Sequence, residues 1–297
     1  MTYSTYVVVS GLVFPESPRW HQDRFWFTDQ FAGRVMTLTL DGVLDTVAAL
    51  PDHAGGLGWL PDGTTLVVGM TERRLHRSKK GSEPFYAQKG SDPFFDPFFE
   101  LHANLAGLAG FHCNDLLVDA QGGAYVGNFG YDILGGAPTV STKLIRVDPD
   151  GRARAVGGPL VFPNGMALTP DGATLIVAET FARRLSSFQV SPDGDLSDHR
   201  TWADLGTATP DGICLDAEGA LWVASPTTRQ LLRVRAGGAV LDRVETLGAP
   251  YACMLGGPDR RILYVCTAET HDPARALGNP SGRIEVVNVA VPGVGLP

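Results

Sequence analysis

Residues 163–179, PNGMALTPDGATLIVAE, contain the unit from which the rest of the chain is built. A short apolar run, GMALT, is followed by the turn pair Asp171-Gly172 and by a second apolar run, TLIVAE. An aspartate–glycine pair between two apolar runs is typical of a β-hairpin. The stretch therefore predicts two antiparallel strands joined by a tight turn.

Five further copies of this hairpin follow one another along the chain. Their second strands are the runs RFWFTD, TTLVVGM, GAYVGN, ALWVAS and ILYVCTA, each preceded by a turn signal. Successive turns are separated by roughly forty to sixty residues, a period typical of four-stranded propeller blades. No segment of a dozen residues keeps the apolar period of a helix, so we expect no helix. The sequence predicts an all-β fold, a six-bladed β-propeller that spans residues 1–297 as one domain.

The two ends of the chain predict how the ring closes. The last repeat lacks an outer strand after RIEVVNV, whereas the first repeat has an additional apolar run, STYVVVSGL, before it. We therefore expect residues 4–12 to complete the last blade. This pairing would close the ring and leave no exposed sheet edge.

Composition restricts the location and the partners. The formal net charge of −8 disfavours a nucleic-acid partner, and a small-molecule substrate is expected. The first residues show no signal peptide and no apolar run could span a bilayer, so we expect a cytoplasmic protein without membrane contact. The four cysteines have no CxxC spacing and are expected to be reduced and buried. We expect a monomer or a homodimer.

A polar cluster emerges when the repeats are aligned on their hairpin turns. The residues seven positions before the first residue of each turn are Glu16, Gly55, Asn114, Asn164, Asp211 and Ala252. Equivalent positions of a propeller lie at one height around the central channel, so the four oxygen donors are expected to converge. Two carboxylates and two amides match a divalent cation. We predict one bound cation, with Ca²⁺ as the expected ion and Zn²⁺, Mn²⁺, Mg²⁺ or Fe²⁺ as alternatives.

Each of these residues also has a simpler explanation. Asn164 and Asp211 both precede a glycine and are typical turn residues, while Glu16 lies in a proline-flanked segment. Asn114 could cap a neighbouring backbone group. The shared offset favours the common site, because four unrelated surface residues have no reason to occupy one register.

At these residues the chain resembles the senescence-marker-protein/gluconolactonase (regucalcin-like) family. The matching stretches are FPESPRW (14–20), NDLLVD (114–119), PNG (163–165), TPDG (169–172), PDG (210–212) and LWVA (221–224), and the likeness runs from about residue 11 to 290. The resemblance implies a six-bladed lactonase that binds calcium or zinc, with diisopropyl fluorophosphatase as a more distant relative. It implies that Glu16, Asn164 and Asp211 bind the metal. It further makes Asp211 the candidate acid/base and Asn114 a substrate contact that also reaches the metal.

The chain departs from the family pattern in three places. Ser17 stands where the family usually has glycine, His112 where sugar lactonases often carry an arginine, and Asn128-Phe129 where Thr-Met is common. The resemblance therefore supports the family's metal site in this chain better than it supports the family's specificity for sugar lactones. We expect His112, Asn128 and Asp132 to contact substrate beside Asn114.

Two long loops, residues 129–142 and 269–282, are predicted to wall the pocket on the side of the ligands. The insertion at residues 78–99 is predicted to lie on the opposite face, where it would cover an edge or contact another subunit. The predicted activity is metal-dependent hydrolysis of a small lactone. Two alternatives stay open: hydrolysis of phosphotriesters or other esters at the same site, and a non-enzymatic propeller that binds calcium or a protein.

Overall fold

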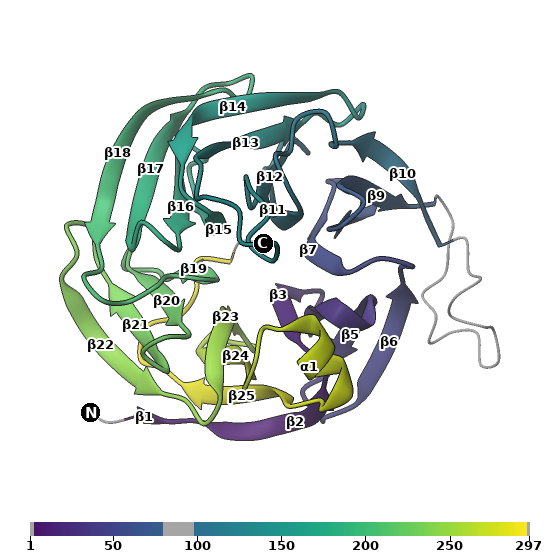
Figure 1. Cartoon of the computed structure of the whole chain (residues 1–297). Coiled ribbons are helices and arrows are strands. Elements are labelled where there is room, and N and C mark those ends of the chain that lie inside the picture. The colour runs from purple at the N-terminus through teal and green to yellow at the C-terminus, as the bar shows by residue number, and fades with distance from the viewer. Residues whose placement is uncertain (1–2, 80–97, 296–297) are drawn as a thin grey trace.

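The computed structural model describes residues 3–79 and 98–295. Six antiparallel sheets are arranged as blades around a central channel (Figure 1). The blades follow one another in chain order, and the innermost strands of neighbouring blades contact each other around the ring. The predicted all-β, six-bladed propeller is confirmed.

Each blade contributes four strands, counted here from the channel outward. The innermost strands are β3 (Pro15–His21), β7 (Ala54–Trp59), β11 (Cys113–Val118), β15 (Pro163–Leu168), β19 (Ile213–Leu215) and β23 (Ala249–Gly256). The second strands are β4 (Arg24–Asp29), β8 (Thr65–Gly69), β12 (Ala124–Asn128), β16 (Thr174–Glu179), β20 (Leu221–Ser225) and β24 (Ile262–Ala268). The third strands are β5 (Arg34–Leu38), β9 (Arg74–Ser78), β13 (Thr142–Val147), β17 (Arg184–Val190), β21 (Gln230–Val234) and β25 (Gly282–Asn288). The outermost strands are β6 (Leu44–Ala49), β10 (Phe99–Asn104), β14 (Ala153–Leu160), β18 (Leu196–Asp204), β22 (Val240–Glu245) and β2 (Tyr6–Leu12).

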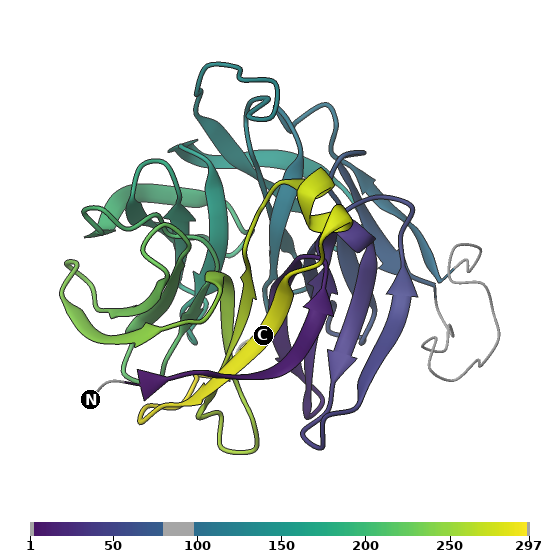
Figure 2. The ribbon, with the colours of Figure 1, turned by 60° about the horizontal axis from the view of Figure 1, so that its bottom comes forward.

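The N-terminal segment closes the ring, as predicted, with one difference. Strand β2 pairs antiparallel with β25 and supplies the outermost strand of the sixth blade, which Figure 2 shows as the purple strand beside the yellow one. The prediction placed residue 4 in the same strand. Ser4 instead belongs to β1 (Tyr3–Ser4), which pairs in parallel with β22 of the fifth blade. The segment thus ties the last two blades together.

The apolar core lies between the blades. One cluster joins Leu66 of the second blade with Val126 of the third, and another joins Tyr125 of the third with Phe188 of the fourth. Corresponding clusters join the remaining neighbours around the ring. Because burial of apolar surface is the main source of stability, each blade depends on both of its neighbours.

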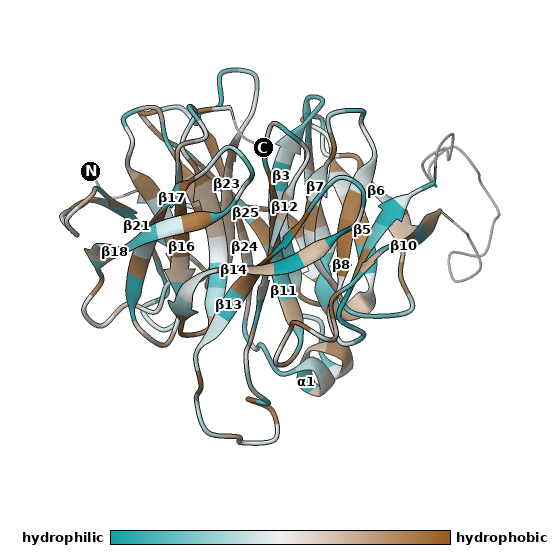
Figure 3. Ribbon diagram, turned by 90° about the horizontal axis from the view of Figure 1, so that it is seen from above, coloured by the Kyte–Doolittle hydropathy of each residue, from teal (hydrophilic) through white to brown (hydrophobic). Residues whose placement is uncertain are grey.

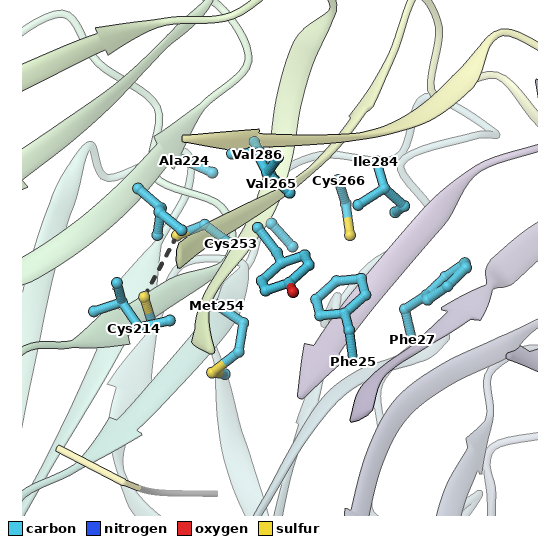
Figure 4. Packing of buried hydrophobic residues seen from close by; sticks show 14 of the residues in the cluster. Phe25, Phe27, Cys214, Ala224, Cys253, Met254, Val265, Cys266, Ile284 and Val286 are labelled. Carbon is cyan, nitrogen blue, oxygen red and sulfur yellow. Dashed lines mark hydrogen bonds between the residues drawn. The ribbon is translucent and has the colours of Figure 1, made fainter. Parts of the chain in front are cut away.

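The predicted reduced cysteines are confirmed. Cys113, Cys214, Cys253 and Cys266 are all buried and unpaired. The Sγ atoms of Cys214 and Cys253 lie 3.9 Å apart on adjacent innermost strands, within the cluster drawn in Figure 4. Burial raises the pKa of both the Cys253 and Cys266 thiols, so these side chains behave as small apolar groups.

The prediction that the chain has no helix is wrong for the loop at residues 269–282. Helix α1 (Pro273–Gly278) lies between β24 and β25, and a 3₁₀ turn, η1 (Gln30–Ala32), lies between β4 and β5. The side chain of Asp272 accepts a hydrogen bond from the Arg275 amide and Pro273 follows it, a strong start for a helix. Six residues are too few to display an apolar period, which is why the pattern was missed.

Both long loops project from one face of the ring. Figure 3 shows α1 and the loop between β12 and β13 on the side opposite the C-terminus. Residues 80–97 of the predicted insertion lie outside the described residues. Within the described ranges, no helix has the length and apolar character needed to cross a membrane.

Candidate functional site

A repeated irregularity in the innermost strands creates the site. In five of them the pairing with the second strand skips one residue near the start of the strand, between Glu16 and Arg19 in β3 and at the equivalent place in β7, β11, β15 and β23. Such β-bulges turn a side chain away from its alternating direction. In the fifth blade, Asp211 and Gly212 lie just before β19 and still exchange backbone hydrogen bonds with Ala224. The seven-residue offset seen in the sequence reflects this shared geometry.

The four predicted donors meet at the mouth of the channel. The Asn114 amide donates a hydrogen bond of 3.1 Å to Oδ1 of Asn164, and Asn164 in turn donates to the Asp211 carboxylate. Glu16 lies close enough to Asp211 for its charge to raise the pKa of Asp211. Asn164 is only 7% exposed. Three of the four side chains thus form a chain of hydrogen bonds, and Glu16 lies within electrostatic reach of its last member.

The two carboxylates are held in an environment that disfavours their charge. Burial raises the pKa of Glu16 to about 8, with a further increase from Asp115 that is opposed by the Ser17 amide and by Arg19. Burial also raises the pKa of Asp211 well above its ordinary value, and the charges of Glu16 and Asp115 raise it further. A nearby cation would lower both pKa values, because it stabilises the ionised forms.

The donor set fits a hard divalent cation. Glu16 and Asp211 supply two carboxylates, and Asn114 and Asn164 supply amide oxygens, which are the ligand types that calcium prefers. Among the described residues, no three His, Cys, Asp or Glu side chains are grouped as a metal site. The set is therefore defined by two acids with two amides.

A third acid, Asp115, was not predicted and is held by Arg19. The guanidinium of Arg19 lies 3.2 Å from Asp115 and also donates to the Leu116 carbonyl oxygen. This ion pair joins the first blade to the third, across the second. Its partners can meet because the second blade contributes Gly56 there, where a Cβ atom would overlap the Leu116 backbone. Paired with Arg19, Asp115 is less available as a ligand than Glu16 or Asp211.

Two more residues support the site and were also missed. Thr180 accepts a hydrogen bond of 3.2 Å from Asn164 and donates one of 2.8 Å to the carbonyl oxygen of Pro210, the residue before Asp211. Tyr251 precedes Ala252; burial raises the pKa of its phenol, and the charges of Asp211 and Glu16 add to this. Tyr251 therefore keeps its proton and can donate. Neither residue lies at the register position, so alignment of the repeats could not identify them.

The predicted substrate contacts occupy different surroundings. His112 is partly buried, with its ring stacked 4.0 Å from Phe111, and burial followed by the charge of His53 lowers its pKa. His112 lies just before β11, two residues from Asn114, and its contact with substrate stays a prediction. Asp132 belongs to the β12–β13 loop, where its carboxylate accepts a hydrogen bond of 2.7 Å from the Gly135 amide.

Asn128 is placed differently from the prediction. Its side chain is 0% exposed and forms hydrogen bonds with Gly110, Gly130, Thr142 and Lys143. The same position at the end of β4 is taken by Asp29, which holds the amides of Val13 and Phe14. Asn128 thus fastens loops around the mouth, and its amide is not presented to the channel.

A large cavity lies at the opposite mouth of the channel. It has a volume of about 870 Å³, and its lining includes Arg19, Trp59, Asp119 and Val294. None of the four predicted donors lines it. We place the candidate site at the other mouth, because the carboxylates with perturbed pKa values converge there.

Comparison with known proteins agrees with the fold and extends over most of the chain. A 6-deoxy-6-sulfogluconolactonase of Pseudomonas putida is 28% identical over 302 residues, which cover 98% of this chain and 96% of that protein. A solved luciferin-regenerating enzyme has a TM-score of 0.81 at 18% identity, covering 98% of both chains. The solved calcium-binding regucalcin of Agrobacterium tumefaciens has a TM-score of 0.79 at 21% identity, covering 100% of this chain and 98% of that one.

The family assignment depends on a continuous match. Residues 14–269 match the family described as SMP-30/Gluconolactonase/LRE-like region. The matched range begins just before Glu16 and contains all four predicted donors together with Thr180 and Tyr251. The chain belongs to the SMP-30/gluconolactonase/LRE-like family.

Proposed function

We propose that the protein is a hydrolase that opens a small lactone at the channel mouth with the help of one divalent cation. The observation that carries this proposal is the proximity of Glu16 and Asp211, two partly buried acids with raised pKa values, beside two amide side chains. Buried acids of this kind are typical of catalytic or metal-binding sites.

The cation would be held by Glu16, Asn164 and Asp211, with Asn114 as a further ligand or a substrate contact. It would supply Lewis-acid polarisation of the lactone carbonyl and would lower the pKa of a water molecule. Ca²⁺ is the expected ion. The name of the Agrobacterium protein, a calcium-binding regucalcin, supports this choice.

Asp211 has the position of an acid/base in this reaction. It accepts a proton as a water oxygen attacks the carbonyl carbon, and it returns that proton to the ring oxygen when the carbon–oxygen bond breaks. The product is the open hydroxy acid. The Thr180–Pro210 hydrogen bond holds the backbone before Asp211, and Tyr251 can donate a hydrogen bond to the developing negative charge.

The names of relatives support a lactone as the substrate. Besides the sulfogluconolactonase, an L-arabinolactonase of Azospirillum brasilense is 30% identical over 113 residues, 37% of this chain and 37% of that protein. Both proteins are named for lactone hydrolysis. The substrate of this chain is a separate matter, because the residues around its site differ from the sugar-lactonase pattern.

The test is a titration assay of acid release on a panel of lactones, aryl esters and phosphotriesters, with and without a chelator. We expect lactone hydrolysis that is lost with chelator and restored by Ca²⁺. Turnover that persists after full removal of divalent cations would contradict the metal mechanism. Turnover of phosphotriesters alone would replace the lactone as substrate class.

The Asp211→Asn substitution distinguishes the two proposed roles of Asp211, acid/base and metal ligand, because an asparagine can still offer an oxygen to the metal but cannot accept the proton. We expect kcat to fall by about 10²–10⁴, the usual contribution of general acid–base catalysis, in protein shown by calorimetry to bind Ca²⁺. Asp150→Asn is the matched control, because Asp150 lies in an exposed turn on the opposite face and pairs with Arg152. Full activity in the Asp211→Asn variant would remove Asp211 as the base.

A further inference from the structure

Phenylalanine side chains gather around the candidate site. Six of them lie at the strand ends and loops on the face of Glu16 and Asp211, and we call them the phenylalanine collar: Phe14, Phe31, Phe111, Phe129, Phe162 and Phe181. They come from the first, third and fourth blades. Collar residues thus surround a large part of the channel mouth.

The rings of the collar contact one another. Phe14 stacks on Phe31 at 4.6 Å, and Phe129 stacks on Phe162 at 4.4 Å. Phe181 lies 4.7 Å from Phe162 and is 45% exposed, so its face is open at the rim. Contacts of this kind between rings leave an apolar surface with few groups that could hydrogen-bond to a ligand.

The gaps in the collar are also filled by aromatic rings. Tyr251 of the sixth blade contacts Phe14 at 4.7 Å, and His53 of the second blade lies 5.2 Å from Phe31. His112 stacks on Phe111. The fifth blade differs, because it presents the hydroxyl pair of Thr209 and Thr227, 2.8 Å apart, on the side of Asp211.

Four polar groups near the collar are already engaged within the protein. The Asn128 amide is buried in the loops, and the Asp132 carboxylate binds its own loop at Gly135. Arg73 donates to the carbonyl oxygen of Ala109, and Arg229 pairs with Glu269 at 3.3 Å. A polyhydroxylated or anionic substituent placed against the stacked rings would therefore lose water and could gain no hydrogen bond from these four groups without breaking one that they already make.

We propose that the substrate is an uncharged lactone with an aryl or similarly bulky apolar substituent, which lies against the phenylalanine collar while the lactone ring lies over Asp211. This inference rests on the proposed lactonase function and adds the substrate class. Exposed apolar side chains on the loops of the same face, Leu134, Val140 and Leu277, extend the apolar surface outward. An aryl group gains both apolar burial and ring contacts there, and the threonine side of the mouth stays available to the polar ring.

The test compares three lactones with the calcium-loaded protein: a phenyl-substituted γ-lactone, the unsubstituted γ-lactone, and gluconolactone. We expect kcat/KM for the phenyl compound to exceed that for the unsubstituted ring at least tenfold, with gluconolactone no better than the unsubstituted ring. The preference should appear mainly as a lower KM for the phenyl compound. The phenyl group makes the same contacts in the bound substrate and in the transition state, so these contacts leave kcat nearly unchanged.

Phe181→Ser tests the collar directly. We expect it to lower the ratio of phenyl to unsubstituted kcat/KM by threefold to tenfold, and Phe111→Ser provides a second variant in case one of them folds poorly. Leu40→Ser is the matched control, because Leu40 is 52% exposed in a turn on the opposite face. The control should keep the wild-type ratio.

The outcomes separate the two proposals. A preference for gluconolactone, or an unchanged ratio in both phenylalanine variants, would overturn the collar as a substrate surface and leave the lactonase intact. Failure to hydrolyse any lactone would overturn both. A high phenyl ratio that falls in the collar variants and persists in Leu40→Ser would support the inference.

Discussion

The strongest test of the site is the effect of pH on the stability of the cation-free protein. The pKa of Glu16 is about 8 in the folded protein, against an ordinary value of 4.5 that applies to the unfolded chain. Between these values the folded protein binds a proton that the unfolded chain does not. The contribution of Glu16 to the free energy of unfolding therefore falls as pH rises through this range, and it levels off about one pH unit above the folded pKa.

Histidines titrate near this range, and a Glu16→Gln variant cancels their effect because it keeps all of them. His21, His53, His76, His102 and His112 have lowered pKa values because of burial. Their contribution to stability rises with pH through their unfolded pKa of about 6.5 and levels off about one pH unit above it. Because the wild type and Glu16→Gln carry the same histidines, the difference between their changes from pH 6.5 to pH 8 isolates Glu16.

The expected change follows from the pKa of Glu16. Its linkage contribution to the free energy of unfolding decreases by about 1–2 kcal/mol from pH 6.5 to 8, and Asp211 changes stability in the same direction. For a chain of this size that corresponds to a fall in Tm of about 3 °C. Saturating Ca²⁺ should abolish the fall, because a bound cation favours both ionised carboxylates.

The measurement is calorimetric unfolding of chelator-treated protein at the two pH values, with and without added Ca²⁺. Glu16→Gln is the informative variant, since it keeps the shape of the side chain and removes the ionisable group. From pH 6.5 to pH 8 the free energy of unfolding of Glu16→Gln should fall clearly less than that of the wild type. Equal changes in the free energy of unfolding in the chelated wild type and in Glu16→Gln would refute the reasoning.

Two further predictions concern the backbone around the site. Ser17 has a φ of 51°, in the left-handed region that glycine adopts without strain, so Ser17→Gly should raise the free energy of unfolding in urea by about 0.5–1 kcal/mol; a loss of stability would contradict this. Gly56→Ala should lower it by about 2 kcal/mol or more, because the added methyl group would overlap the Leu116 backbone. Gly107→Ala, which meets nothing within 4 Å, is its control, and equal effects of the two substitutions would show that close packing is not the cause.

Much of the fold could be predicted because its signals are local. A strand and its turn occupy about ten residues, and the turn pair Asp171-Gly172 with its flanking apolar runs already determines one hairpin. Six copies of that signal set the number of blades. The surplus strand at the N-terminus and the missing strand at the C-terminus determined how the ring closes, as the pairing of β2 with β25 confirms.

The site could be predicted only as far as the repeats are equivalent. Alignment placed Glu16, Asn114, Asn164 and Asp211 at one height, and the structure brings them together. It could not show that Asn128 points into the loops, because the polar groups of Gly110 and Lys143 that hold it belong to other segments. Nor could it show the short helix in residues 269–282, whose start depends on one capping aspartate.

The sequence by itself determined the all-β architecture, the six blades and the set of four donors, since strand period and turn chemistry act between near neighbours. Only the tertiary structure decided that Arg19 neutralises Asp115, that Thr180 supports the backbone before Asp211, and that phenylalanines of three blades surround the mouth. These relations join residues that are tens of positions apart in the chain. Their distances depend on the closed ring, which brings separate repeats around one axis.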